Sequence, residues 1–153
     1  SQTSLQRSFS LVERTGLSTF SPYFTRKDKR SSTYRMVREA YDEVYGSEHE
    51  PVIIEDVAIE EDAYQKASEL WQHPEIDCIF SNGDDMAAGF LQVYEEAGKQ
   101  LPFIMGQENM LAGRLLGLST IDNKSYQLGQ ESFKRVLSEE KKTIVFKSEF
   151  IQR

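Results

Sequence analysis

Two carboxylates follow apolar runs that have the length of buried strands, and they are the first candidates for chemistry. Asp84 comes after the run at 78–80 and its turn, and Glu108 comes after the run at 102–105. In an open parallel sheet both positions lie at the carboxyl edge, where ligands bind. Carboxylate oxygens accept hydrogen bonds and suit hydroxyl donors, as on a sugar. The residues leave a simpler alternative open, in which Asp84 only caps a helix and Glu108 only starts another.

Other chemistries find little support in the sequence. Asp84 and Asp85 are a possible pair for Mg²⁺, but adjacent residues at a helix start diverge and no third acid close in sequence completes a cage. His49 and His73 lie far apart beside prolines, so we expect neither in a triad or a metal site. Nucleophile-elbow and phosphate-loop motifs are absent, and the glycines between 106 and 117 lack the dinucleotide spacing. We therefore expect no enzyme, no metal and no cofactor.

Length and charge narrow the class of protein. The 153 residues have a one-domain length and a net charge of −7, from 25 acidic and 18 basic side chains. This charge argues against a nucleic-acid surface in the chain, and the basic run at 26–30 is interpreted as a solvated loop. The single cysteine, Cys78, lies in an apolar run, which predicts a buried, inert thiol.

The ends and the hydropathy of the chain give two further expectations. Neither a membrane-spanning run nor a signal-peptide pattern is visible, so we expect a cytoplasmic setting. The chain begins without Met, so we expect that it is cut from something longer.

The elements that would position the two carboxylates alternate between strands and helices. Strands are expected at 9–12, 51–57, 78–80, 102–105, 118–121, 143–146 and 149–152. Helices are expected near 34–45, 63–71, 84–97, 110–116 and 124–140, with Gly46 and Gly98 closing the first and third. The segment between Arg14 and Ser32 is interpreted as a long loop. The alternation predicts an α/β fold, a three-layer Rossmann-like parallel sheet with helices on both faces.

The order of several motifs resembles the LacI-type transcriptional regulators (LacI/GalR family). The stretch from Ile79 to Gly89, followed by the one from Glu95 to Pro102, is similar to the family text IFAxNDDMAxG…REAGxxVP. Other segments resemble, in chain order, FREAL (Val37–Tyr41), the end of GDF (Asp56–Val57), VGYDN (Met105–Asn109), LTTI (Leu118–Ile121), ELGRR (Gln127–Gly129) and LVVR (Phe150–Arg153). The resemblance covers most of residues 5–153.

The resemblance implies one lobe of a two-lobed sensor that is similar to periplasmic sugar-binding proteins. A small effector, often a sugar or a purine, binds between the lobes; the protein is a homodimer, and a separate N-terminal helix-turn-helix binds operator DNA. Residues 1–118 would form the C-terminal lobe, 119–146 a crossover whose helix normally packs on the N-terminal lobe, and 147–153 the returning strand. The helix-turn-helix and the N-terminal lobe are not among these residues. A transport-type sugar-binding protein without DNA binding is the alternative.

The resemblance also implies ligand-binding positions, with departures from the family pattern. The Asn of NDD aligns with Gly83, and Asn82 stands beside it. The Asp of VGYD aligns with Glu108, which is one methylene longer and is followed by Asn109.

Two further family positions have lost their usual side chains. The aromatic residue of GDF aligns with Val57, so a stacking contact is lost, and the Arg before FREAL aligns with Thr33, with Arg30 near but out of register. The candidate effector-binding residues are therefore Asp84, Glu108, Asn82, Gly83, Asn109, Thr33, Arg30 and Val57.

The helix expected from Lys124 carries apolar residues that would lack their usual cover without an N-terminal lobe. We expect this helix to pack on its own lobe or on a second chain, because several large apolar side chains left in water are costly.

Overall fold

A mostly parallel sheet forms the centre of the computed structural model, which describes residues 6, 10, 20–24 (backbone only), 32–46, 50–74, 76, 78–138 and 143–153. In this part of the chain the strands are β1 (Phe20–Phe24), β2 (Ile53–Ile54), β3 (Cys78–Ser81), β4 (Phe103–Gln107), β5 (Ser119–Asp122) and β6 (Glu149–Ile151). Their spatial order is β2-β1-β3-β4-β5-β6. Neighbouring strands are parallel from β2 through β5, whereas β6 runs antiparallel to β5. The predicted α/β class is confirmed.

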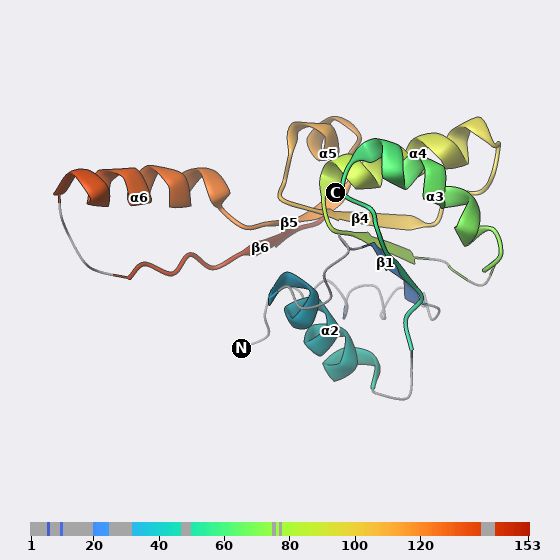
Figure 1. Ribbon diagram of the computed structural model, residues 1–153, viewed down its shortest axis with the longest axis horizontal. Helices are drawn as coiled ribbons and strands as arrows, with labels where there is room; N and C mark the ends of the chain where they lie inside the picture. The colour runs from blue at the N-terminus through green and yellow to red at the C-terminus, as the bar shows by residue number, and fades with distance from the viewer. Residues whose placement is uncertain are drawn as a thin grey trace.

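Helices cover both faces of this sheet. They are α2 (Ser32–Tyr45), α3 (Glu60–Leu70), α4 (Asp84–Glu96), α5 (Leu111–Leu115) and α6 (Ser125–Ser138). Helix α2 lies on one face, and α3 and α4 lie together on the other (Figure 1). The expected helices are therefore present, and Gly46 and Gly98 both adopt positive φ just beyond α2 and α4.

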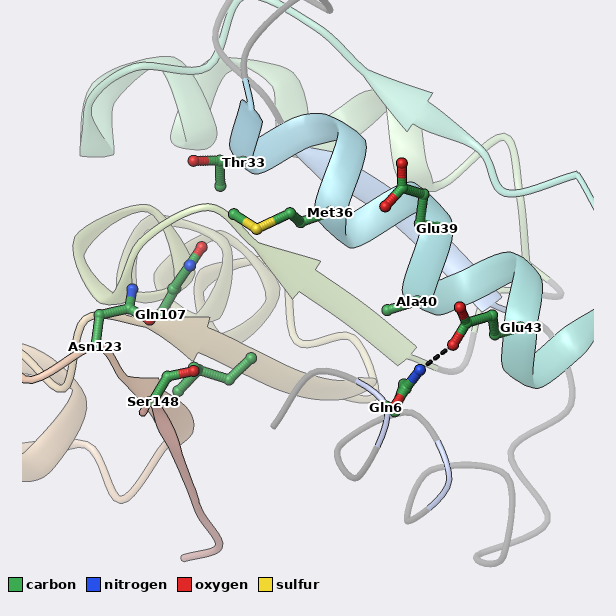
Figure 2. A pocket seen from close by; sticks show the side chains of 10 residues that line it. Gln6, Thr33, Met36, Glu39, Ala40, Glu43, Gln107, Asn123 and Ser148 are labelled. Carbon is green, nitrogen blue, oxygen red and sulfur yellow. Dashed lines mark hydrogen bonds between the residues drawn. The ribbon is translucent and has the colours of Figure 1, made fainter. Parts of the chain in front are cut away.

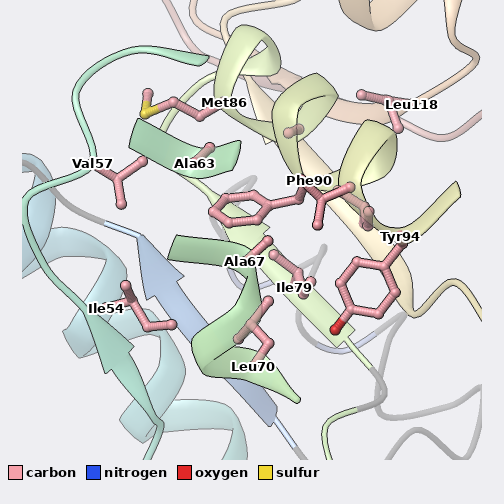
Figure 3. Packing of buried hydrophobic residues seen from close by; sticks show 13 residues of the cluster. Ile54, Val57, Ala63, Ala67, Leu70, Ile79, Met86, Phe90, Tyr94 and Leu118 are labelled. Carbon is pink, nitrogen blue, oxygen red and sulfur yellow. The ribbon is translucent and has the colours of Figure 1, made fainter. Parts of the chain in front are cut away.

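Two hydrophobic cores result, one on each side of the sheet. The alternation of side chains along β3 sends Phe80 toward α2 and Ile79 toward α3 and α4. Both are fully buried, as expected for a central strand of a parallel sheet. Figure 3 shows the core between the sheet and helices α3 and α4, in which Phe90 and Leu70 pack beside Ile79. Cys78 is buried and free, so the predicted inert thiol is confirmed in its placement.

The start of the chain differs from the sequence-based expectation. The first strand is β1 at Phe20–Phe24, within the segment that was expected to be a loop, and Ser10 of the expected strand at 9–12 is helical. Pro22 lacks an N–H for the ladder, which weakens the strand pattern of this segment. The structure accommodates it where the register of β1 against β3 shifts, between Phe20 and Tyr23. The rest of the 9–12 run lies outside the described residues.

Smaller differences concern strand ends. The expected strand at 51–57 is hydrogen-bonded as a strand only at Ile53–Ile54, and Asp56 turns the chain with a φ of 63°. The expected strand at 143–146 has no strand structure, whereas β6 confirms the one near 149–152.

Helix α6 stands away from the rest of the molecule. The chain leaves the sheet through β5, forms α6, and returns through β6 beside β5 (Figure 1). None of the residues of α6 is buried. Packing on its own lobe, one of the two arrangements expected for this helix, is therefore not found. Among the described residues no helix is long and apolar enough to cross a membrane.

Candidate functional site

The carboxyl edge of the sheet gathers the two carboxylates that the sequence singled out. Strands β3 and β4 are parallel neighbours, so the residues that follow them meet at one edge. Asp84 follows β3 as the first residue of α4, and Glu108 directly follows β4. The two side chains have very different surroundings, and these decide what each can do.

Asp84 is fully buried and bonded inside the fold. Its Oδ1 accepts a hydrogen bond from Thr120 Oγ1 at 2.7 Å, and its Oδ2 accepts one from the Met110 backbone N–H at 2.6 Å. Burial, the largest effect, raises the pKa of the Asp84 carboxyl, and the two hydrogen bonds oppose that rise. The carboxylate thereby ties α4 to β5 and to the turn before α5.

The expectation that Asp84 caps α4 is wrong. The residue at the N-cap position is Gly83, with a φ of 178° and no side-chain cap bond, and Asp84 is already helical. The side chain turns toward β5 because Thr120 and Met110 offer it two donors there.

Two glycines make room for this carboxylate. A Cβ on Gly106 of β4 or on Gly113 of α5 would collide with the carboxylate oxygens of Asp84. Both positions therefore require glycine for close approach. The sequence reading missed this role, because the collision joins residues that are far apart in the chain.

The turn after β4 has an uncommon backbone. Glu108 and Asn109 have φ values of 89° and 53°, a region that costs non-glycine residues about 1–3 kcal/mol each where it is strained. The Glu108 N–H donates to the Ile121 carbonyl at 2.8 Å, and the Asn109 N–H donates to Thr120 Oγ1 at 3.3 Å. These bonds hold the turn against its conformational cost.

The Asn109 side chain supports this turn through both of its polar atoms. Its Nδ2 donates to Asp122 Oδ2 at 3.2 Å, and its Oδ1 accepts from Arg153 Nη2 at 2.6 Å. Arg153 also donates to the Leu118 carbonyl at 2.8 Å. The C-terminal residue thus anchors the turn that carries Glu108.

Glu108 itself presents an exposed carboxylate at the edge. Its Oε1 accepts from Asn123 Nδ2 at 2.9 Å, and its Oε2 accepts from Ser125 Oγ at 3.1 Å. Each carboxylate oxygen retains a further lone-pair site, so a ligand hydroxyl can be accepted as well. The sequence reading missed Asn123 and Ser125. They could have been found by the pattern that identified Glu108, because both are polar residues that follow a parallel strand, here β5, and so reach the same edge of the sheet.

A pocket of about 260 Å³ lies on the α2 side of this edge. It is lined by Gln6, Thr33, Met36, Glu39, Ala40, Glu43, Gln107, Ile121, Asn123 and Ser148. Figure 2 shows the Gln107 side chain extending from the end of β4 toward Thr33 and Met36 on α2. Asn123 belongs both to this wall and to the contacts of Glu108.

Two buried polar atoms at the strand ends lack partners among the described residues. They are Gln107 Oε1 and Ser81 Oγ, at the ends of the neighbouring strands β4 and β3. Gln107 is 7% exposed and Ser81 is fully buried. Buried polar atoms are normally hydrogen-bonded, and of these two residues Gln107 is the one that lines the pocket.

The remaining candidates are spread over the edge. Thr33 lines the pocket, Asn82 is half-buried in the turn before α4, and Gly83 is buried beside it. Val57 is fully buried in the core on the opposite side of the sheet, against α3 and α4. Arg30 lies outside the described residues. Ligand contact by any of these residues stays a prediction.

The fold, a mostly parallel sheet with helices on both faces, matches one lobe of a periplasmic-binding-protein-like structure. No family model and no curated protein matches the chain. Solved structures do match. A LacI-family transcriptional regulatory protein from Corynebacterium glutamicum has a TM-score of 0.80 at 24% identity, over 98% of this chain and 63% of that one.

Two further matches were solved with sugars. A LacI family regulator from Enterococcus faecium with bound ribose has a TM-score of 0.76 at 20% identity, over 99% of this chain and 62% of that one. A LacI family regulator from Arthrobacter in complex with lactose has a TM-score of 0.80 at 20% identity, over 97% and 62%. The chain has the fold of these LacI-family structures and spans less than two thirds of their length.

Proposed function

We propose that this chain is the effector-sensing part of a LacI-type transcriptional regulator and that its effector is a sugar or a related small molecule. The exposed Glu108 carboxylate carries the proposal. It stands at the carboxyl edge of the sheet on a turn that is hydrogen-bonded to its neighbours, and similar chains have been solved with ribose and with lactose. The chain itself catalyses no reaction in this proposal.

The proposed architecture follows the resemblance. Residues 1–118 form one lobe, 119–146 form the crossover to a second lobe, and 147–153 return to the first. The regulator acts in the cytoplasm as a homodimer and contacts operator DNA through a domain outside these residues.

The contacts of Glu108 suggest how a ligand signal leaves the site. Of the two residues that hold its carboxylate, Asn123 lies in the link between β5 and α6, and Ser125 is the first residue of α6. A ligand hydroxyl that bonds to the same oxygens changes the balance of these contacts. It thereby favours one position of α6 over another, which is a population shift between existing arrangements.

Calorimetric titration of the 153-residue chain with ribose, lactose and other neutral sugars tests the binding step. Replacing Glu108→Gln removes the charged acceptor, worth about 1.5–3 kcal/mol, so we expect affinity to fall about ten- to a hundredfold. The matched control is Glu95→Gln, an exposed acid on α4, which should bind like the natural chain. Equal affinity in the Glu108 variant, or no binding of any sugar, would contradict the proposal.

The regulatory step needs the full-length gene product. A sugar that binds the chain should change the affinity of that protein for its operator in a gel-shift titration at fixed salt. An operator affinity that is the same with and without the sugar would contradict regulation by that sugar, and no operator binding at all would favour the transport-type alternative.

A further inference from the structure

The pocket beside α2 contains a polar group that the fold leaves unsatisfied. Gln107 is 93% buried, since it is 7% exposed, and its Oε1 has no hydrogen-bond partner among the described residues. The side chain lies in the wall of the pocket and extends toward α2 (Figure 2). An acceptor buried in this way is destabilising unless something supplies a donor. A ligand with an N–H or O–H group at this point would supply it.

The charge of the pocket is one-sided. Among the described residues that line it, the charged ones are Glu39 and Glu43, both exposed on α2, and none of these ten is Lys, Arg or His. The Gln6 side-chain amide donates to the Glu43 carboxylate. A third carboxylate, that of Glu108, accepts a hydrogen bond from Asn123, which lines the pocket. Walls of one sign raise the local concentration of the opposite charge, and like charges disfavour the wrong ligand.

Size and shape narrow the ligand further. Met36, Ala40 and Ile121 give the pocket an apolar wall on which the C–H face of a ring can lie. Its volume of about 260 Å³ is at or just below the lower end of ordinary small-molecule sites, which are roughly 300–1,000 Å³. The pocket therefore suits one sugar-sized ring better than two.

We propose that this pocket extends the effector site and selects a small polar molecule that carries a protonated amine, such as an amino sugar. A donor group of the ligand satisfies Gln107 Oε1, and its ammonium group pairs with the carboxylates of Glu39 and Glu43. Neutral analogues bind more weakly and phosphorylated ones are excluded. This inference rests on the proposed function and adds the charge class of the effector.

The test uses ligands that share a ring and differ in charge. The probes are glucose, galactose and mannose, the corresponding 2-amino sugars, and the corresponding 6-phosphates. Binding to the 153-residue chain is measured by calorimetry and by ligand-observed NMR at low salt. We expect at least one amino sugar to bind about tenfold more tightly than its neutral parent, and we expect no phosphate to bind.

Variants assign the preference to residues. Replacing Glu39→Gln and Glu43→Gln together should bring the ratio of amino-sugar affinity to neutral-sugar affinity down to about one. The matched control is Glu61→Gln with Glu95→Gln, two exposed acids on α3 and α4, which should keep the advantage. Replacing Gln107→Met removes the unsatisfied acceptor at similar volume. That variant should fold, as checked by circular dichroism, and should lose affinity for every ligand that binds.

The outcomes separate this inference from the function on which it rests. If neutral sugars bind in a Glu108-dependent way and amines bind no more tightly, the charge preference is wrong and the proposed function stands. Binding of a phosphate, or an amine preference that survives in the Glu39 and Glu43 variant, also overturns the inference alone. If no probe binds, both are overturned.

Discussion

At the scale of single residues, Asp84 is the most heavily constrained side chain of the candidate edge. Its carboxylate has two donors from distant parts of the chain and two glycines that make space for it. Glu108, one strand away, is exposed. We infer that Asp84 serves the rigidity of the edge and that Glu108 serves the ligand.

The raised pKa of Asp84 predicts how its contribution to stability depends on pH. The folded state holds this proton more tightly than the unfolded state, so the contribution is full below the ordinary Asp pKa of about 3.9 and is lost as pH rises through the folded-state pKa. The free energy of unfolding of the natural chain minus that of Asp84→Asn should therefore decrease with rising pH. Urea unfolding from acidic to neutral pH measures this difference, and an increase with pH would contradict the prediction.

The space around Asp84 predicts strong coupling with Gly113. Gly113→Ala alone should destabilise the chain by about 1–3 kcal/mol, because the new Cβ meets the carboxylate. In an Asp84→Ala background the same change should cost little or stabilise, since Ala is the better helix former. Gly129→Ala, where a Cβ meets nothing within 4 Å, is the control and should not destabilise. Additive effects of the two substitutions, measured by urea unfolding, would show that the space is not limiting.

Residues such as these mark the limit of prediction from the sequence. The placement of Asp84 and Glu108 at one edge followed from strand and turn patterns that are local in the chain. The hydrogen-bond partner of Asp84 could not be predicted in this way, because Thr120 is 36 positions away and no residue near Asp84 indicates it. The local preference of Asp for helix caps gave the wrong role, since buried tertiary donors outweighed it. The unsatisfied Gln107 is likewise visible only once the strands are packed.

At the scale of elements, most of the fold was predictable because its helices and central strands have clear periods. Strand β1 was not predictable, because Pro22 and Ser21 interrupt its apolar positions. It is held in place by pairing with β2 and β3 on either side. Helix α6, in contrast, was predicted correctly from its sequence pattern alone. The structure has this helix, although no described residue packs against it closely enough to bury any of its side chains.

The isolation of α6 predicts fast backbone exchange. A helix of 14 residues without tertiary packing is marginal in water, so its amides should exchange many-fold faster than those of α4, which buries seven residues. Hydrogen–deuterium exchange at low protein concentration measures both helices in one experiment. Protection of α6 equal to that of α4 under these conditions would show that the helix has a partner in the single chain.

At the scale of the whole molecule, the exposed side of α6 is the main apolar feature that the lobe leaves uncovered. Tyr126, Phe133, Val136 and Leu137 are 67–77% exposed. Burying one such side chain is worth about 1.5–3 kcal/mol, so contact with a second chain offers a substantial gain. Association through this helix, the second arrangement expected from the sequence, stays a prediction.

Light scattering as a function of concentration tests this association. The natural chain should grow in mass with concentration, and Phe133→Glu with Leu137→Glu should hold it at the mass of one chain. Gln130→Glu, a polar position of the same helix, is the control and should associate like the natural chain. A monomer at all concentrations, with α6 ordered, would refute the prediction.

The pairing of β5 with β6 fixes where the two connections to α6 leave the sheet. Lys124 lies where they diverge, with Nζ 3.2 Å from Asp122 Oδ2 and 2.8 Å from Glu149 Oε2, so the two exit points are held side by side. The strand pairing ends at Asp122 and Glu149, and the described residues 143–148 on the way back from α6 form no strand. The lysine therefore acts as a clamp: it keeps both connections starting from one point of the sheet edge, whatever position α6 takes beyond it.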